Sequence, residues 1–306
     1  MRVLLFFIDG VGLGRHQTEN PFAFTATPGI NRLLGGRQLV KEALGYSGPK
    51  VSLFGLDAAL GVPGLPQSAT GQASLFTGIN APKLIGKHMS GFPDRALRAL
   101  LARKGIFKQL NKHGFRTNFA NAYRPSFFKH LNHGLPGNGY SCSTLVTFYG
   151  GLPFYDLTDI GNGRALFMDI TNDTLQKMGF NVPLISPEEG AQRLLKIAGS
   201  YHFCLFEYFL SDLAGHMKDR IEAGRIVNIL DRFIATLADE TEKDEIMLIV
   251  TSDHGNLEDL STGEHTLNRV PALLIGSYKV RQLMANKMFD LTDVLPAVLK
   301  ILDNDY

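Results

Sequence analysis

Short apolar runs alternate with amphipathic stretches along most of the chain. Each run is four to eight residues long, in the range typical of strands, and is bounded by turn residues. Because the runs are continuous rather than alternating, they predict strands that are buried on both faces of a parallel sheet. The predicted strands are residues 3–8, 51–56, 115–120, 203–210, 246–250 and 271–275.

Helices are predicted between these strands by apolar positions that recur every three or four residues. The best-defined helix begins at Ser186, which is followed by proline and two glutamates, a combination typical of a helix N-terminus. Its buried face consists of Ala191, Leu194, Leu195 and Ala198. Further helices are predicted at about 67–76, 104–113, 226–237 and from about 292 to the end.

Strands that alternate with helices predict βαβ units. We expect an α/β fold with a doubly wound, mostly parallel sheet and helices on both faces, in a single domain over residues 1–306. The stretch 121–185 is the exception, because proline, glycine and aromatic residues interrupt every period there. Such a long excursion predicts a small lid or cap inserted into the domain.

Composition narrows the class of protein. The chain has 31 basic and 29 acidic residues, a net charge of +2 and no basic run, so we expect no nucleic-acid partner. Its apolar start ends at Asp9, which is too early for a membrane span, and it lacks a signal-peptide cleavage pattern. We expect a cytoplasmic protein without a membrane partner, in which Cys142 and Cys204 are buried thiols. The oligomeric state is left open.

Polar residues with catalytic or metal-binding chemistry lie next to the predicted strands. In open α/β sheets the carboxyl ends of the strands meet at one edge, where ligands bind. Each residue alone has an ordinary explanation: an aspartate before glycine shapes a turn, a serine caps a helix, and Asp and His four residues apart form a surface pair. The set consists of Asp9, Ser68, Asp212, His216, Asp253, His254 and His265.

Taken together, these residues demand a different explanation. Three aspartates and three histidines at one sheet edge would repel or desolvate one another unless positive charge lies among them. A pair of divalent cations supplies that charge, and imidazole combined with carboxylate suits Zn, Mn or Fe(II) better than Mg or Ca. We therefore expect two divalent metal ions, with Mn or Zn favoured.

Five short segments also resemble one enzyme superfamily. They are residues 7–12 (FIDGVG), 67–71 (QSATG), 212–216 (DLAGH), 251–256 (TSDHGN) and 265–271 (HTLNRVP). Their order resembles that of the alkaline phosphatase superfamily, and most closely the branch of cofactor-independent phosphoglycerate mutase and phosphopentomutase. The resemblance spans the chain apart from about 121–185.

The resemblance implies a ligand set and a reaction. One metal would be held by Asp212, His216 and His265, and a second by Asp9, Asp253 and His254, with the Ser68 oxygen at the second metal. Two metals about 4 Å apart stabilise both the attacking and the leaving oxygen of an in-line displacement. The implied cycle is attack by Ser68, a phosphoserine intermediate, and transfer to water or to an acceptor hydroxyl.

Departures from the family pattern decide between the possible activities. Gln72 stands where the mutase branch usually has a histidine, and it cannot carry charge. The stretch 121–185 is small for sealing a site against water, which a mutase must do. No Pro- and Arg-containing sulfatase motif surrounds Ser68. We therefore expect hydrolysis of a small phosphate ester. A phosphomutase acting on a sugar or glycerate phosphate is the alternative, and a catalytically inactive metal-binding scaffold is the third possibility.

Four residues are candidates for binding a small phosphorylated substrate. Arg124 is the first, because a guanidinium binds phosphate through two hydrogen bonds. The others are Asn121, which follows the same predicted strand, and Lys87 and His88, which follow the Ser68 helix. The alternative for each is a solvated surface group.

Overall fold

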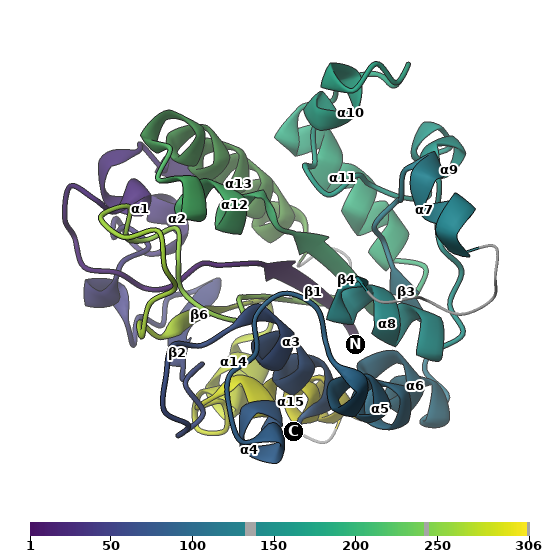
Figure 1. Cartoon of the computed structure of the whole chain (residues 1–306). Helices are drawn as coiled ribbons and strands as arrows, with labels where there is room; N and C mark the ends of the chain where they lie inside the picture. Colours follow the sequence, from purple (N-terminus) through teal and green to yellow (C-terminus); the bar gives the residue numbers. More distant parts are fainter. Residues whose placement is uncertain (132–138, 242–244, 305–306) are drawn as a thin grey trace.

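One six-stranded sheet organises the molecule (Figure 1). The structure is a computed structural model that describes residues 1–131, 139–241 and 245–304. The strand order is β2-β6-β5-β1-β4-β3. The strands are β1 (Arg2–Ile8), β2 (Val51–Leu56), β3 (Thr117–Phe119), β4 (Phe203–Tyr208), β5 (Ile246–Thr251) and β6 (Val270–Ile275). Each of the six apolar runs therefore forms a strand, as predicted.

The sheet is mostly parallel, which confirms the predicted fold class. β1 pairs in parallel with β4 and β5, and β3 pairs in parallel with β4. β6 runs antiparallel to both of its neighbours, β5 and β2. The residues that precede β6 therefore lie at the same sheet edge as the residues that follow the parallel strands.

The alternation of side chains along β1 explains why its sequence is apolar throughout. Successive residues of a strand point to opposite faces of the sheet. Leu4, Phe6 and Ile8 belong to the apolar core on one face, and Val3, Leu5 and Phe7 belong to the core on the other. Both faces are covered, so neither set tolerates a polar residue.

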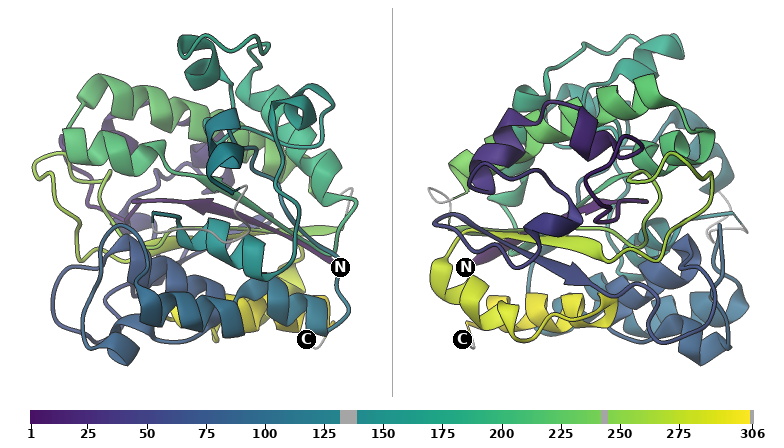
Figure 2. Two further views of the ribbon diagram at one scale, coloured as in Figure 1. Left: turned by 45° about the vertical axis from the view of Figure 1, so that its right-hand side comes forward. Right: turned by 90° about the vertical axis from the view of Figure 1, so that its left-hand side faces the viewer.

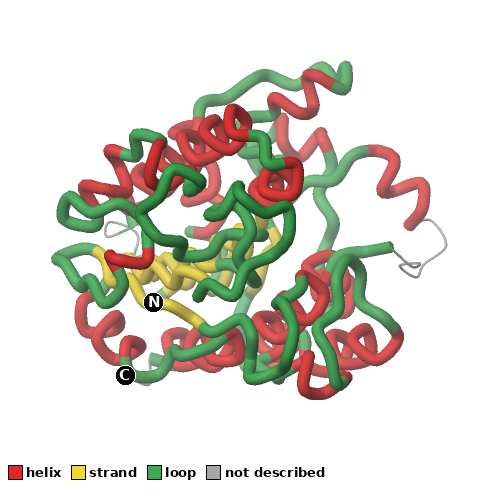
Figure 3. Tube along the Cα trace, turned by 60° about the vertical axis from the view of Figure 1, so that its left-hand side comes forward, coloured by secondary structure: helices red, strands yellow, loops and turns green. Residues whose placement is uncertain are grey.

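Helices form the two covering layers (Figures 2 and 3). Figure 3 shows the yellow sheet between two layers of red helices. One layer includes α1 (Pro21–Phe24), α2 (Pro28–Leu33), α11 (Pro187–Ala198), α12 (Leu210–Met217) and α13 (Arg220–Glu240). The other includes α3 (Ser68–Thr77), α4 (Ala81–Ile85), α5 (Arg95–Lys104), α6 (Ile106–Lys112), α8 (Cys142–Tyr149), α14 (Tyr278–Ala285) and α15 (Val294–Leu302). The short 3-10 helix η2 (Leu291–Asp293) packs against α3 and α15 in this second layer, and η1 (Lys41–Ala43) contributes Ala43 to the core of the first.

The start of α11 has the predicted cap. The Ser186 hydroxyl accepts a hydrogen bond from the Glu189 amide at 3.2 Å, and the Glu189 carboxylate accepts one from the Ser186 amide at 2.7 Å. This reciprocal pair satisfies two amides that a helix start otherwise leaves without partners. Pro187 occupies the first turn, where its missing amide hydrogen costs nothing.

The stretch 121–185 divides between the core and the periphery. α8 is buried and packs against α3, α5 and α6. α7 (Pro125–Leu131), α9 (Leu157–Gly161) and α10 (Asp173–Lys177) lie beside β3 and α11 at the right of Figure 1. A small separate apolar cluster in this region is centred on Ile160, Phe167 and Leu175. The division into one domain with a lid at 121–185 stays a prediction, with α8 as the part that packs into the core.

Two further predictions concern the helices and the thiols. No helix in the described ranges is both long and apolar enough to cross a membrane. The cytoplasmic location stays a prediction. Cys142 and Cys204 are free and buried, as the sequence predicts.

Candidate active site

The carboxyl edge of the parallel strands brings together all seven residues singled out in the sequence. Two strands are followed directly by candidate ligands, β1 by Asp9 and β5 by Asp253 and His254, with only Ser252 between. α12, which follows β4, carries Asp212 and His216 one turn apart. His265 precedes the antiparallel strand β6, and Ser68 begins α3. Their spatial relations fall into two groups that share Asp212.

The first group is Asp212, His216 and His265, whose candidate ligand atoms all lie within 4.8 Å of one another. Nε2 of His216 is 3.3 Å from Asp212 Oδ2 and 3.2 Å from His265 Nε2. The Nδ1 atoms face backbone carbonyls, that of His216 at 2.7 Å from Gly263 O and that of His265 at 2.8 Å from Pro66 O. Since a carbonyl only accepts, Nδ1 carries the proton in both rings, and each Nε2 directs a lone pair into the group.

The second group surrounds His254 and the candidate nucleophile. Nε2 of His254 is 2.9 Å from Ser68 Oγ, 3.3 Å from Asp9 Oδ1 and 3.5 Å from Asp253 Oδ2. Asp9, Asp212 and His254 also offer ligand atoms within 4.8 Å of one another. Asp212, which the resemblance assigns to one metal, thus lies within reach of both groups.

Gln72 links the two carboxylates of the second group. Its Nε2 donates to Asp9 Oδ2 at 3.0 Å and to Asp253 Oδ2 at 3.1 Å, while the Gly10 amide donates to Asp253 Oδ1 at 3.3 Å. These neutral donors satisfy three of the four oxygens. Asp9 Oδ1 is buried without a hydrogen-bond partner, and so is Asp212 Oδ1.

The electrostatics of this edge fit bound cations. Burial, together with the nearby charge of Asp253, raises the pKa of Asp9 well above its usual value, and burial raises the pKa of Asp253 to about 6. Burial lowers the pKa of His254 to about 4 and also lowers the pKa of His265. The imidazoles of His254 and His265 are therefore neutral at neutral pH, whereas the raised pKa of Asp9 means that its carboxylate needs positive charge beside it to stay ionised. A cation that supplies this charge would bind beside the unpartnered oxygens of Asp9 and Asp212.

Two glycines allow these groups to approach. Gly10 has φ +69°, and a Cβ atom there would lie 2.5 Å from Asp212 Oδ1. A Cβ atom on Gly71 would lie 2.7 Å from the backbone oxygen of Asp253. Without side chains at these positions, the loop after β1 reaches α12, and the first turn of α3 reaches the loop after β5.

Two buried glutamates near the site were missed in the sequence. Glu207 of β4 accepts a hydrogen bond from Ser143 Oγ at 2.6 Å, and burial raises its pKa to about 7. Its place within an apolar strand was a usable signal. Glu258 follows the Asp-His-Gly segment and is fully buried. A lone glutamate in a polar loop has no spacing that distinguishes it from a surface residue.

The four substrate-binding candidates have different surroundings. Arg124 is exposed, with Nη1 3.3 Å from Met178 Sδ, and Lys87 is exposed. His88 is half-buried, with Nε2 3.2 Å from Val62 O, and the next residue bonds to the first turn of α3 through Thr70. The amide of Asn121 exchanges two hydrogen bonds with the backbone of Glu207, which favours a structural role. Their part in substrate binding stays a prediction.

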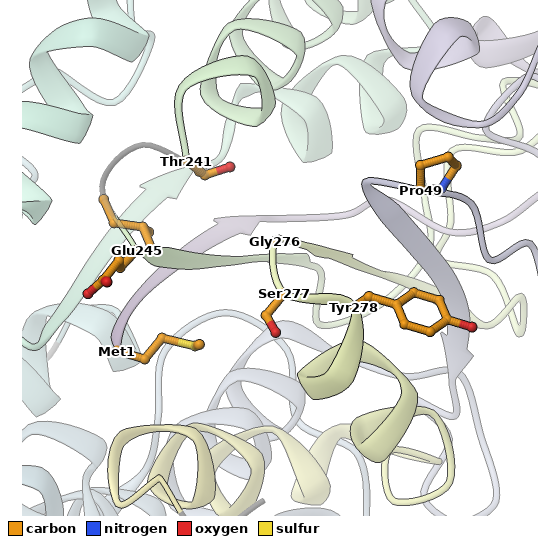
Figure 4. Close-up of a pocket in the computed structure, with 8 residues that line it drawn as sticks. Met1, Pro49, Thr241, Glu245, Gly276, Ser277 and Tyr278 are labelled. Carbon is orange, nitrogen blue, oxygen red and sulfur yellow. The ribbon is translucent and has the colours of Figure 1, made fainter.

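A separate cavity of about 510 Å³ lies at the opposite edge of the sheet (Figure 4). It is bounded by Met1 before β1, Ile246 at the start of β5 and Gly276 after β6. At this edge the parallel strands β1 and β5 begin and the antiparallel strand β6 ends. The cavity shares no residue with the candidate active site.

Comparison with known proteins supports the resemblance seen in the sequence. Residues 165–305 match the model of the Metalloenzyme superfamily. That range contains Asp212, His216, Asp253, His254 and His265. A 2,3-bisphosphoglycerate-independent phosphoglycerate mutase from Antithamnion sp. is 30% identical over 109 residues, which are 34% of this chain and 21% of the relative. The chain thus matches about a fifth of the length of that relative.

Solved structures with the same fold extend over nearly the whole chain. The alkaline phosphatase from the Antarctic bacterium TAB5 superposes with a TM-score of 0.56 at 13% identity, covering 99% of this chain and 98% of that structure. A phosphoglycerate mutase from Leishmania mexicana gives a TM-score of 0.58 at 11% identity, covering 98% and 95%. At these identities the likeness concerns the fold.

Fold and sequence matches together show that the chain resembles the metalloenzymes of the alkaline phosphatase superfamily. Within that superfamily, the chain resembles the cofactor-independent phosphoglycerate mutase branch.

Removal of one first-group histidine should weaken metal binding. His216→Ala takes away a ligand atom at a half-exposed position, so the fold should persist while the affinity for Mn²⁺ falls by about tenfold or more. Isothermal titration and metal content after dialysis measure the change. The control is His113→Ala, which removes an exposed ring at the end of α6. This variant should bind Mn²⁺ as the parent does. Unchanged metal content in His216→Ala would contradict the assignment.

Metal binding should also depend on pH. In the absence of cations, Asp253 with a pKa of about 6 and Asp9 with a raised pKa hold protons that a metal must displace. Below about pH 6 the affinity should therefore fall by roughly tenfold per pH unit for each displaced proton. His254 does not compete until about pH 4. Titrations in buffers of different ionisation enthalpy count the released protons, and an affinity that is constant from pH 5 to 8 would refute this expectation.

Proposed function

We propose that this protein hydrolyses small phosphate esters through a phosphoserine intermediate on Ser68. Two divalent cations, Mn or Zn, would be held by Asp9, Asp212, His216, Asp253, His254 and His265. The observation that carries the proposal is the position of Ser68 Oγ, 2.9 Å from His254 Nε2, beside buried aspartate oxygens that have no hydrogen-bond partner. A hydroxyl in such a place has the surroundings of a nucleophile rather than of a simple helix cap.

The environment of Ser68 favours phosphate as the group it attacks. Ser68 is the first residue of α3, a helix of ten residues. The amides of the first helical turn and the helix dipole place partial positive charge where phosphoryl oxygens would lie. Three histidines among the proposed ligands favour Mn or Zn over Mg or Ca.

The reaction has two balanced steps. Bound cations would lower the pKa of the serine hydroxyl and stabilise charge on the attacking and leaving oxygens. Ser68 Oγ gives up its proton and forms a bond to phosphorus, the ester P–O bond breaks, and the leaving alkoxide takes up a proton and departs as the alcohol. Water then attacks the phosphoserine, which releases inorganic phosphate and restores the hydroxyl.

Two observations favour hydrolysis over mutase chemistry. Gln72 donates to Asp9 and Asp253 but contributes no charge of its own at the second group. α8, from the middle of 121–185, is built into the core beside α3 and α5, which leaves less of this segment to close over a bound intermediate. A mutase must keep water from its phosphoserine, so a smaller cover favours release to water. A phosphomutase on a sugar or glycerate phosphate is the second candidate, supported by the phosphoglycerate mutase relative.

Ser68→Ala should lower turnover of an aryl phosphate by about 10³-fold or more, because it removes the hydroxyl that would attack phosphorus. Bound Mn²⁺ should remain close to the parental level. The matched control is Ser74→Ala on the same helix, where the hydroxyl donates to Thr70 O and lies away from the candidate ligands. Ser74→Ala should keep its turnover. Full activity in Ser68→Ala would remove the nucleophile assignment.

The fate of the phosphoryl group separates the two candidate activities. Metal-loaded protein is incubated with a panel of phosphorylated metabolites, and both free phosphate and isomerised ester are measured. A hydrolase releases one phosphate for each ester consumed, as we expect here. An isomeric phosphate ester formed without free phosphate would instead establish the mutase.

A further inference from the structure

Glu258 is a fully buried carboxylate in the loop between β5 and β6, close to the proposed ligands but not among them. A buried charge is costly unless hydrogen bonds compensate it. Glu258 meets this requirement with four donors, which fill both of its oxygens. The identity of these donors indicates what the residue does.

Each oxygen of Glu258 accepts two hydrogen bonds. Oε2 accepts from the backbone amides of Gly12 and Asn256, both at 2.8 Å. Oε1 accepts from the Thr266 hydroxyl and from Asn268 Nδ2, the latter at 3.1 Å. Bonds from uncharged donors to a carboxylate are among the stronger hydrogen bonds in proteins.

The donors come from three loops that each carry proposed ligands. Gly12 lies three residues after Asp9. Asn256 lies two residues after His254, and Thr266 directly follows His265. One side chain therefore ties together the loop after β1, the loop after β5 and the segment before β6. Together these segments supply four of the six proposed ligands.

The sequence makes room for this side chain with glycines. A Cβ atom on Gly12 or Gly255 would clash with the Glu258 carboxylate. A Cβ atom on Gly14 would lie 2.9 Å from Glu258 Cγ. The packing around Glu258 is thus as restrictive as its hydrogen bonding, so the carboxylate has one position.

Asp231 shows what a purely structural carboxylate looks like in the same molecule. It is also buried, and it accepts hydrogen bonds from the amides of Gly29 at 3.1 Å and Ile30 at 2.6 Å. These bonds join α13 to the start of α2. Neither Gly29 nor Ile30 adjoins a proposed ligand. Glu258 differs in that all four of its donors lie within three residues of a proposed ligand.

We propose that Glu258 is a positioning residue that holds the ligand-bearing loops in the geometry required to bind the cations. It acts through two backbone amides and two side chains of these loops and contacts neither cation nor substrate. The inference rests on the proposed metal centre. It goes beyond it by assigning part of the metal affinity to a side chain outside the ligand set.

The test compares Glu258→Gln with Asp231→Asn. Both changes replace a buried carboxylate by an amide of the same size and leave an NH₂ group facing donors, so both should lower the melting temperature. Titration with Mn²⁺ well below both melting temperatures should show a 10- to 100-fold larger Kd for Glu258→Gln and a change of less than twofold for Asp231→Asn. At saturating Mn²⁺, kcat of Glu258→Gln should return to within about threefold of the parent, because the ligands themselves are intact.

Several outcomes would overturn the inference. A Kd for Glu258→Gln within twofold of the parent would do so, as would an equal loss of affinity in Asp231→Asn. If Glu258→Gln does not fold, Thr266→Val removes one donor without burying a mismatched amide. A Kd increase of about threefold or more is then expected, and parental affinity in Thr266→Val would count against the inference.

The same measurements distinguish this inference from the proposed function. Weakened Mn²⁺ binding in Glu258→Gln, in a protein that turns over no phosphate ester, would leave the positioning role intact and remove the hydrolase. Phosphatase activity with parental Mn²⁺ affinity in Glu258→Gln would leave the hydrolase intact and remove the positioning role. A parent that binds no divalent cation would overturn both.

Discussion

The mutual repulsion of buried carboxylates at one sheet edge is the constraint on which the site depends. Asp9, Asp212 and Asp253 lie around His254 with too few donors among them to satisfy their oxygens. Gln72 and the Gly10 amide relieve part of this repulsion without adding charge. Bound cations would neutralise the repulsion that remains among the three carboxylates. A fold that gathers such groups spends stability to do so, which is what a preorganised site requires.

The sheet brings the proposed ligands together at one edge. Asp9 and the Asp253–His254 pair follow parallel strands and therefore lie at one edge of the sheet. His265 precedes its strand, but β6 runs in the reverse direction, so His265 lies at the same edge. Backbone carbonyls then orient two of the imidazoles, and Glu258 fixes the loops between them. The strands thus determine the edge at which the proposed ligands lie, the loops determine their spacing, and backbone contacts determine the direction of the two imidazole rings.

The sequence predicted the parts of this arrangement that leave a periodic or positional pattern. Six apolar runs gave six strands, and the Ser186 capping sequence gave the start of α11. The candidate ligands were recognisable because they lie close in sequence to the strand ends at one sheet edge. The reversal of β6 was not predictable, since an apolar run has no direction. The roles of Gln72 and Glu258 were equally hidden, because they depend on which distant groups their side chains meet. The packing of α8 into the core was obscured by the irregular sequence around it.

The position of β1 in the middle of the sheet has a consequence for how the molecule comes into being. β1 pairs on one side with β4 at residues 203–208 and on the other with β5 at residues 246–251. A nascent chain can therefore not close its central sheet until residues 203–251 have left the ribosome, because both partners of β1 are synthesised long after β1 itself. Asp9 therefore meets Asp253 and His254 only after β5 and the residues that follow it have been synthesised. Uptake of the proposed cations would therefore follow closure of the sheet around β1.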